Sequence, residues 1–352
     1  MKPLFSAVAA VGLGLSALII GLSLAGFDPA TSLGALWSGS FGSWDAFTSA
    51  TMVRAVPLIL VGLGIAIAFR GGALNFGAEG QFYAGAIAAT WVGLQLGSIP
   101  RPLAVALLII AAAVAGLLWV VIPVWLKLRF GVLEVISTLL LNFIAVSLVS
   151  LMVQGPLQER QRIYPQSESI PEAARLPLLL PGSRLHAGLV IALVAGVILW
   201  YVFARTLWGF QLRAVGLGPK AAEVSGRIDS QRMGAVALLL SGGIAGLAGG
   251  VEVSGVSYAL FQNLSPGYGF TGIAVALLGG LHPIGVVLAG ILFGALQAGA
   301  GAMQREAGIP AVTVNVVEAT IIIVALLATA PPGGWIRLRG AVRRRITPRA
   351  SA

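Results

Sequence analysis

Long apolar runs follow one another through almost the whole chain, and they constrain its fold more than any other feature. Most of them approach the 20 or so residues that a helix needs to cross a bilayer. They cover residues 4–25, 53–69, 78–97, 102–125, 133–153, 187–204, 233–252, 268–281, 284–302 and 312–330. This pattern predicts an all-α, polytopic membrane helix bundle of about ten transmembrane helices, forming a single domain over residues 1–352. The runs at 53–69 and 268–281 are short for a full crossing, so we expect broken or re-entrant segments.

The composition excludes several classes of function. Only 10% of the 352 residues are charged and 58% are hydrophobic, whereas soluble domains carry about 25% charged residues. The absence of Cys and the presence of only two His argue against a zinc centre or a thiol nucleophile. None of the three lysines is followed by Ser or Thr, so the chain lacks a phosphate-binding P-loop. We therefore expect a chain that is not an enzyme and binds no cofactor itself.

The basic residues predict how the chain is oriented in the membrane. With the N-terminus inside, 15 of the 22 Lys and Arg residues fall in cytoplasmic segments, as the positive-inside rule requires. This places both termini in the cytoplasm, residues 154–186 in an extracytoplasmic loop and residues 205–232 in a cytoplasmic loop. The basic tail, 337–352, is expected to touch anionic lipid. The net charge of +10 is thereby attributed to membrane topology, and no nucleic-acid partner is expected.

One polar, glycine-rich segment interrupts the apolar runs near the start of the chain. Residues 69–83 read FRGGALNFGAEGQFY. Irregular backbone beside a span is tolerated where protein or water satisfies it, and such breaks often form ligand sites. A tight hairpin is an equally good interpretation and is compatible with the first: Glu79 would then lie in a first helical turn and Asn75 would cap that helix. Asn75, Glu79 and Gln81 are the candidate pathway residues.

Further polar residues lie inside or beside later spans. Ser137, Thr138 and Asn142 lie in the run that begins at Glu134. Hydrogen bonds between helices explain Ser137 and Thr138 better, while for Asn142 a place on a polar pathway is equally plausible. Glu134 and Glu318 are the evident candidates for intramembrane carboxylates.

The cytoplasmic segment 216–226 reads GLGPKAAEVSG. Pro219 suits the first position of a short helix and Gly226 suits its end. The helix would display a small, exposed, Ala-rich surface. It is either an ordinary amphipathic connection, which the residues alone slightly favour, or a docking element for a soluble partner.

Two short stretches echo each other. Residues 64–72 read GIAIAFRGG and residues 272–280 read GIAVALLGG. Because Gly, Ala and Ile are common throughout the chain, chance explains the echo as well as duplication does. Duplication would mean two related halves around a central pathway.

Three stretches together resemble the permease subunits of ATP-binding-cassette importers, in the branch that serves ribose-type sugars and nucleosides. They are GLGIAIAFRGGALNFGAEGQ at 62–81, LRAVGLGPKAAEVSGRI at 212–228 and GFTGIAVALLGG at 269–280. Their order is the order that the family uses, and the first is most similar to the larger permease of nucleoside systems. Thr271 departs from the pattern, because nucleoside relatives often carry an acidic residue there.

The resemblance implies roles and partners. The second stretch is similar to the coupling helix that docks on the ATPase, which implies that role for Pro219, Lys220, Ala221, Ala222 and Gly226. ATP and Mg²⁺ would bind to the ATPase and not to this chain. The further partners implied are a second permease, giving a heterodimer, and an extracytoplasmic substrate-binding protein. The first stretch would flank the translocation pathway.

We therefore expect a non-catalytic permease of the cell membrane that imports nucleosides or related purine compounds. A neutral nucleoside needs aromatic stacking and a few amide or hydroxyl partners. The predicted pathway residues are Asn75, Phe76, Glu79, Gln81, Phe82 and Asn142. The alternatives are an ABC permease for ribose-type simple sugars, an ion-coupled secondary transporter and a membrane scaffold.

Overall fold

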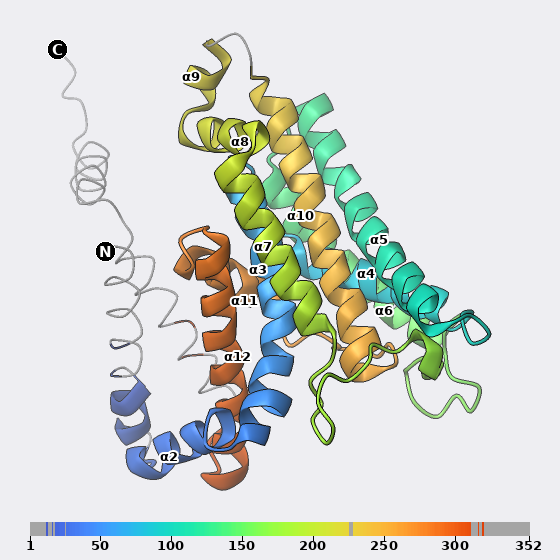
Figure 1. Ribbon diagram of the computed structural model, residues 1–352, viewed down its shortest axis with the longest axis vertical. Helices are drawn as coiled ribbons and strands as arrows, with labels where there is room; N and C mark the ends of the chain where they lie inside the picture. The colour runs from blue at the N-terminus through green and yellow to red at the C-terminus, as the bar shows by residue number, and fades with distance from the viewer. Residues whose placement is uncertain are drawn as a thin grey trace, which may run out of the picture.

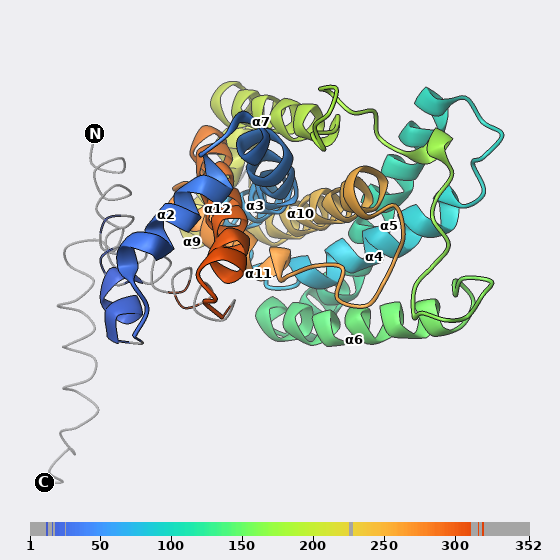
Figure 2. The same ribbon diagram turned by 90° about the horizontal axis from the view of Figure 1, so that it is seen from below.

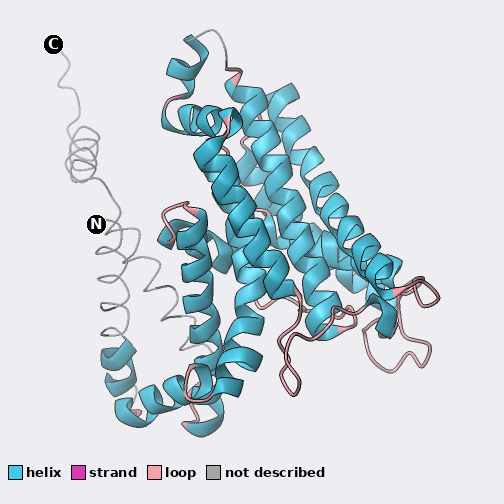
Figure 3. Ribbon diagram, in the orientation of Figure 1, coloured by secondary structure: helices cyan, strands magenta, loops and turns pink. Residues whose placement is uncertain are grey.

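The computed structural model describes residues 26–224 and 228–310, together with 12, 16, 18–24, 316 and 319. Within these ranges the chain is built from helices and contains no strand, only isolated bridges between loops (Figure 3). This confirms the all-α helix bundle. The elements are α2 (Pro29–Ser40), η1 (Ala46–Met52), α3 (Val53–Arg70), α4 (Ala78–Gly93), α5 (Arg101–Phe130), α6 (Glu134–Gln154), η2 (Glu172–Ala174), α7 (Gly188–Arg205), α8 (Leu207–Leu217), α9 (Pro219–Val224), α10 (Ser230–Glu252), η3 (Val253–Ser257), α11 (Tyr268–Leu278) and α12 (Pro283–Glu306).

Eight of the ten apolar runs coincide with helices of this structure. Six helices of the described part are long and apolar enough to cross a membrane. They are Ala46–Arg70, Arg101–Phe130, Glu134–Gln154, Gly188–Arg205, Ser230–Ser257 and Pro283–Glu306. Most of the runs 4–25 and 312–330, and the whole tail 337–352, lie outside the described residues.

Two boundaries differ from expectation. The run 53–69 is not short, because the π-helical turn η1 continues into α3 and makes one helix of 25 residues, Ala46–Arg70. The Thr and Ser residues of η1 hid this extension from an apolar-run search. Conversely, α4 has only 16 residues and ends at Gly93. The expectation of a short segment near 268–281 is confirmed, since α11 has 11 residues.

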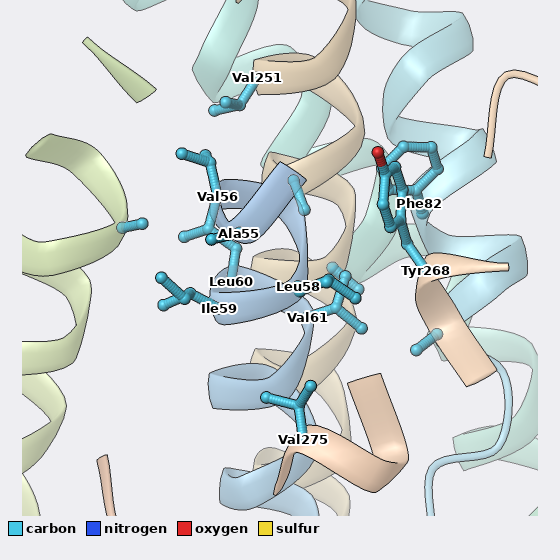
Figure 4. Packing of buried hydrophobic residues seen from close by; sticks show 14 of the residues in the cluster. Ala55, Val56, Leu58, Ile59, Leu60, Val61, Phe82, Val251, Tyr268 and Val275 are labelled. Carbon is cyan, nitrogen blue, oxygen red and sulfur yellow. The ribbon is translucent and has the colours of Figure 1, made fainter. Parts of the chain in front are cut away.

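The bundle has a nearly solvent-free centre. α3 packs on α10, α11 and α12, α4 packs on α5, α6 and α10, and α7 flanks α3 (Figures 1 and 2). Fifteen of the 18 residues of α3 are buried, including the apolar side chains of Figure 4, such as Leu58, Ile59 and Leu60. α3 is therefore a core helix of the protein and not one that faces lipid.

Glycines allow three helices to meet at their backbones. A Cβ atom on Gly246 of α10 would come within 2.4 Å of the carbonyl oxygen of Ala112 on α5, and one on Gly85 of α4 would come within 2.1 Å of the Gly246 carbonyl oxygen. Small residues at such crossings are the usual way for membrane helices to pack tightly. The α4–α5–α10 contact is therefore one of the closely packed parts of the bundle.

The two ends of the bundle differ in character. α8, α9 and the C-terminal end of α3 lie at one end (Figure 1). The loop between α6 and α7, which carries η2, lies at the opposite end (Figure 1). We call these the α9 end and the loop end. The described parts of segments 154–186 and 205–232 thus lie at opposite ends of the bundle, and the side of the membrane that each end faces stays a prediction.

The two stretches that resemble each other in sequence end α3 and α11 in the same way. Gly71 and Gly279 follow the last residues of α3 and α11, and the next glycines have positive φ angles of 73° and 62°. Glycine adopts this conformation without steric cost, and the paired hydrogen bonds are those of a Schellman motif. The bonds are Gly72 N to Phe69 O, Ala73 N to Ala68 O, Gly280 N to Leu277 O and Leu281 N to Ala276 O. Because many helices end in this way, the shared geometry leaves both duplication and chance open.

Candidate functional site

The polar segment between α3 and α4 forms a sharp break in the bundle. α3 ends at Arg70, and the chain reaches α4 through residues 71–77 without regular structure. Asn75 is fully buried here. Backbone N–H and C=O groups at such a place must be satisfied by protein, because lipid offers no hydrogen bonds.

Asn75 is the centre of a closed hydrogen-bond network. Its Oδ1 accepts from Gly77 N and from Gln81 Nε2, both at 2.9 Å. Its Nδ2 donates to Gln81 Oε1 and to Ser241 Oγ on α10, both at 2.8 Å. Asn75 therefore orders the turn before α4 and fastens it to α10. The expectation that Asn75 caps α4 is wrong, because the N-cap position is Gly77 and receives no side-chain cap.

Asn142 of α6 caps the first turn of α4, which Asn75 does not do. Its Oδ1 accepts from Gly80 N at 2.8 Å, and its Nδ2 donates to Phe76 O at 2.8 Å. Gly80 is the third residue of α4, so its N–H is one of those that a helix leaves unpaired at its start. The buried Asn142 side chain is thus a cap provided by another helix.

Glu79 connects α4 to the start of α11. It lies in the first turn of α4, as expected, and is buried. Its Oε2 accepts from Gly269 N at 2.6 Å. Ser265 Oγ accepts from the neighbouring Tyr268 N at 2.9 Å. The two oxygens together satisfy the N-terminal end of α11, where an acceptor is favoured by the helix dipole.

The two phenylalanines differ in exposure. Phe82 is fully buried, and its ring centroid lies 5.7 Å from that of Tyr268 (Figure 4). Its distance from the ring centroid of Tyr83 is 5.8 Å. Phe76 is half-buried, and its ring lies 6.2 Å from that of Phe69. Phe76 is the candidate whose ring is more accessible.

The six predicted pathway residues are therefore brought together at the α4 start, with Asn142 contributed by α6. Most of their polar atoms pair with protein, so this cluster first of all supports the break and the start of α11. A role in contacting substrate stays a prediction for each of them. Ser241 and the α11 residues Tyr268 and Gly269 belong to the same cluster and were not singled out from the sequence.

A second group of predicted residues lies at the α9 end. α9 begins at Pro219, as expected, and Lys220 and Ala221 are exposed. Ala222 is buried, so the expected exposed Ala-rich surface is only partly present. Gly226 lies outside the described residues.

The α9 end is in contact with the break. A Cβ atom on Gly216 of α8 would come within 2.1 Å of the Arg70 carbonyl oxygen at the end of α3. The Arg70 guanidinium lies 4.5 Å from the centre of the Phe203 ring on α7. α8 and α9 are therefore joined to the backbone that carries the Asn75 network.

The loop end is fastened to the two π-helical turns. Leu176 N donates to Ser254 O of η3 at 2.9 Å, and Arg184 N donates to Ser49 Oγ of η1 at 3.1 Å. His186 is fully buried, and its Nδ1 accepts from Gly188 N at 3.1 Å. Burial, together with the charge of Arg184, lowers the pKa of His186 to about 4. The neutral imidazole is thus part of the folded loop.

Three further carboxylates remain to be placed. Glu134 accepts from Lys127 Nζ at 2.8 Å, so it is a paired residue near the α9 end. Glu318 lies outside the described residues. The sequence analysis missed Glu252, a buried carboxylate at the end of α10. A lone charged residue beside an apolar run is the signal that could have identified it. No group of His, Cys, Asp and Glu in the described part is placed to hold a metal ion.

Comparison with known proteins places the chain in a family. Residues 47–326 match the family described as the permease component of branched-chain amino acid transport systems. The guanosine ABC transporter permease NupP of Bacillus subtilis is 40% identical over 320 residues, covering 89% of this chain and 90% of NupP. The glucose ABC transporter permease TsgB13 of Haloferax volcanii is 36% identical over 331 residues, covering 91% and 85%. A second guanosine permease of B. subtilis, NupQ, is 30% identical over 254 residues, covering 70% and 79%. The chain belongs to the ABC transporter permease family of the branched-chain amino acid type.

Proposed function

We propose that this chain is one membrane subunit of an ATP-driven importer that carries nucleosides or related purine compounds. The observation that carries the substrate assignment is the 40% identity with a guanosine permease over 89% of the chain. The matched region includes the α3–α4 break, the short helix α9 and α11. Sequence similarity of this extent covers every element that the preceding section describes as a site.

A simple sugar is the second candidate substrate. A glucose permease is 36% identical over 91% of the chain, which is nearly as similar. The buried amide network around Asn75 does not discriminate between a sugar hydroxyl and a base amide. The substrate is therefore decided by transport measurements and not by overall similarity.

The mechanism assigns no covalent chemistry to this chain. ATP and Mg²⁺ belong to a separate ATPase that docks on α9, through the exposed residues Pro219, Lys220 and Ala221. The positive-inside count supports placing the α9 end and both termini in the cytoplasm. Movement of α9 is passed to α8, which touches the end of α3 at Gly216. The α3–α4 break then changes access to the pathway.

The remaining partners meet other parts of the chain. An extracytoplasmic binding protein delivers its ligand to the loop end, within 154–186. A second permease completes the pathway, and the existence of two guanosine permeases in one organism, both similar to this chain, supports a heterodimer. Apolar helix faces such as that of α6, which exposes Leu140 and Phe143, contact lipid or the second permease.

The test is uptake by cells with and without this chain, with its partner subunits present. We expect loss of labelled guanosine uptake on deletion, while glucose uptake stays unchanged. Loss of glucose uptake alone would move the substrate to sugars and leave the permease assignment in place. Unchanged uptake of both compounds would contradict the proposed substrates.

Docking is tested on α9. Ala221→Glu places a carboxylate on the exposed side of this helix, and we expect it to reduce ATP-driven uptake while the chain still reaches the membrane. Gln95→Glu is the matched control, because Gln95 is exposed beyond the end of α4. Equal uptake by both variants would contradict docking at α9. Ala222→Glu is unsuitable, because it would bury a charge and disturb the loop itself.

A further inference from the structure

Glu252 has a buried carboxylate oxygen without a partner. The residue is 6% exposed, and its Oε2 makes no hydrogen bond in the described part of the chain. Two other buried side-chain atoms there lack a partner, Trp119 Nε1 and His186 Nε2, but neither belongs to an acidic group. Burying a carboxylate without pairing it is costly, and an ionisable group inside a membrane bundle is by default a sign of function.

The groups that interact electrostatically with Glu252 come from three elements. Arg54 of α3 and Arg184 of the α6–α7 loop are the cations that interact with it electrostatically. Neither forms an ion pair with Glu252 within the described residues, and Arg54 Nη1 donates instead to Ala50 O at 3.2 Å. Tyr268 of α11 interacts electrostatically with both Glu252 and Arg54. We call Arg54, Glu252 and Tyr268 the outer polar cluster.

Glu252 and Arg54 lie next to two unusual helical turns. Glu252 is followed directly by the π-helical turn η3, Val253–Ser257. Arg54 is preceded by the π-helical turn η1, Ala46–Met52. π-helical turns are rare and are frequently found at functional sites, because the wider turn leaves backbone and side chains in uncommon positions. α3 and α10 pack against each other, so the two turns occur on neighbouring helices at the same end of the bundle.

Glu252 and Arg54 lie at the loop end of the bundle, where substrate would enter, and Tyr268 connects them to the start of α4. The α6–α7 loop is attached to both π-helical turns, through Ser49 of η1 and Ser254 of η3. The aromatic ring of Phe82 packs on Tyr268 beside the cluster (Figure 4). A buried acceptor without a donor, beside two aromatic rings that meet at 57°, is suited to an aromatic solute that carries N–H groups.

The geometry points to Glu252 as a specificity-determining residue of the translocation pathway, which accepts a hydrogen bond from the base N–H of the transported nucleoside. This inference rests on the proposed function and deepens it by assigning the group that recognises the base. Guanosine carries a lactam N–H donor that a carboxylate accepts, whereas the corresponding ring nitrogen of adenosine is an acceptor. An amide in place of the carboxylate offers a donor as well as an acceptor, which suits adenine better.

The test is transport by the reconstituted importer, with its ATPase, second permease and binding protein, at saturating loaded binding protein. Glu252→Gln keeps the shape of the side chain and replaces the carboxylate oxygen that has no partner by an amide group. We expect guanosine transport to fall about tenfold to a hundredfold, the range for a hydrogen bond whose loss leaves a buried partner unsatisfied. Adenosine transport falls less, so the preference for guanosine is lost. Glu306→Gln, which changes an exposed carboxylate at the end of α12, is the control and leaves both rates unchanged.

Thermal stability of the same complexes separates recognition from a structural role. Glu79→Gln removes a carboxylate that accepts from Gly269 N, and it is expected to lower Tm. Glu252→Gln replaces an oxygen that accepts no hydrogen bond, so it breaks no bond and is expected to leave Tm equal or raise it. The inference is overturned if Glu252→Gln lowers Tm and reduces transport of guanosine and adenosine equally. It is also overturned if guanosine transport stays within twofold of wild type.

A different result would contradict the proposed function itself. If the wild-type importer carries no nucleoside, the substrate assignment is wrong, and with it the recognition of a base by Glu252. A failure of the inference alone is seen only in the Glu252→Gln variant, while the wild-type complex still transports guanosine.

Discussion

Replacement of Asn142 by leucine tests whether the α3–α4 break depends on a cap from another helix. Leucine has a similar volume and removes both hydrogen bonds, the one from Gly80 N and the one to Phe76 O, each 2.8 Å long. Side-chain bonds between membrane helices contribute about 0.6 kcal/mol each on average, which would make the pair worth about 1.2 kcal/mol. Here the partners are buried backbone groups, and leaving one unsatisfied costs about 1–3 kcal/mol. If both backbone groups are left unsatisfied, Asn142→Leu lowers the free energy of unfolding by about 2–6 kcal/mol.

The free energy of unfolding in mixed micelles, followed by tryptophan fluorescence, decides between these values. Ser147→Ala on the same helix is the control, because Ser147 is exposed and its hydroxyl donates to Phe143 O within α6. Amide hydrogen exchange of the peptide containing Gly80 gives a local readout, and we expect its protection to be lost in Asn142→Leu. A loss of unfolding free energy no larger than that of Ser147→Ala, with Gly80 still protected, would refute the reasoning.

Two further predictions concern the loop end and the glycine contacts. Because burial lowers the pKa of His186 to about 4 from about 6.5 in the unfolded chain, the unfolded state binds more protons between these values. The free energy of unfolding therefore has its full value above pH 6.5 and falls by up to about 3 kcal/mol as the pH drops to 4. Unfolding curves measured across this range would show the decrease. A flat profile would contradict the buried neutral imidazole. Gly246→Ala places a Cβ atom 2.4 Å from Ala112 O and 2.7 Å from the Gly116 Cα, so we expect a marked loss of thermal stability. A Cβ atom at Gly243 on the same helix meets only ordinary contacts beyond 3.4 Å. Gly243→Ala is therefore expected to leave the free energy of unfolding unchanged or to raise it by up to about 1 kcal/mol. Equal effects of the two substitutions would disprove the close approach.

The fold was largely predictable from local features of the sequence. Glycine pairs such as Gly71–Gly72 mark helix ends because a positive φ angle is needed there, and apolar runs mark spans. The missing part of the first long span was not predictable in this way. η1 is rich in Thr and Ser, so no apolar pattern announces the wide turn that extends α3 to 25 residues.

The candidate site was predictable in its location and less so in its contacts. Asn75, Glu79 and Gln81 were singled out because polar residues beside Gly-rich backbone are unusual between two spans. Their partners are separated from them by long stretches of chain, as with Ser241, which lies 166 residues from Asn75. Such pairings depend on tertiary packing. Glu252 was missed for a different reason: it closes an apolar run, where a charged residue resembles an ordinary helix end.

The close packing of α10 has a mechanical consequence. Its 23 residues span about 34 Å at the rise of an α-helix, from Ser230 near α9 to Glu252 at the loop end. The glycine contacts around Gly246 leave no compressible side-chain layer between this helix and α5. We therefore expect α10 to move as a rigid element, so that a displacement of its first turn also displaces its last turn. A movement started by the ATPase that we propose to dock on α9 would therefore reach the carboxylate that we assign to recognition.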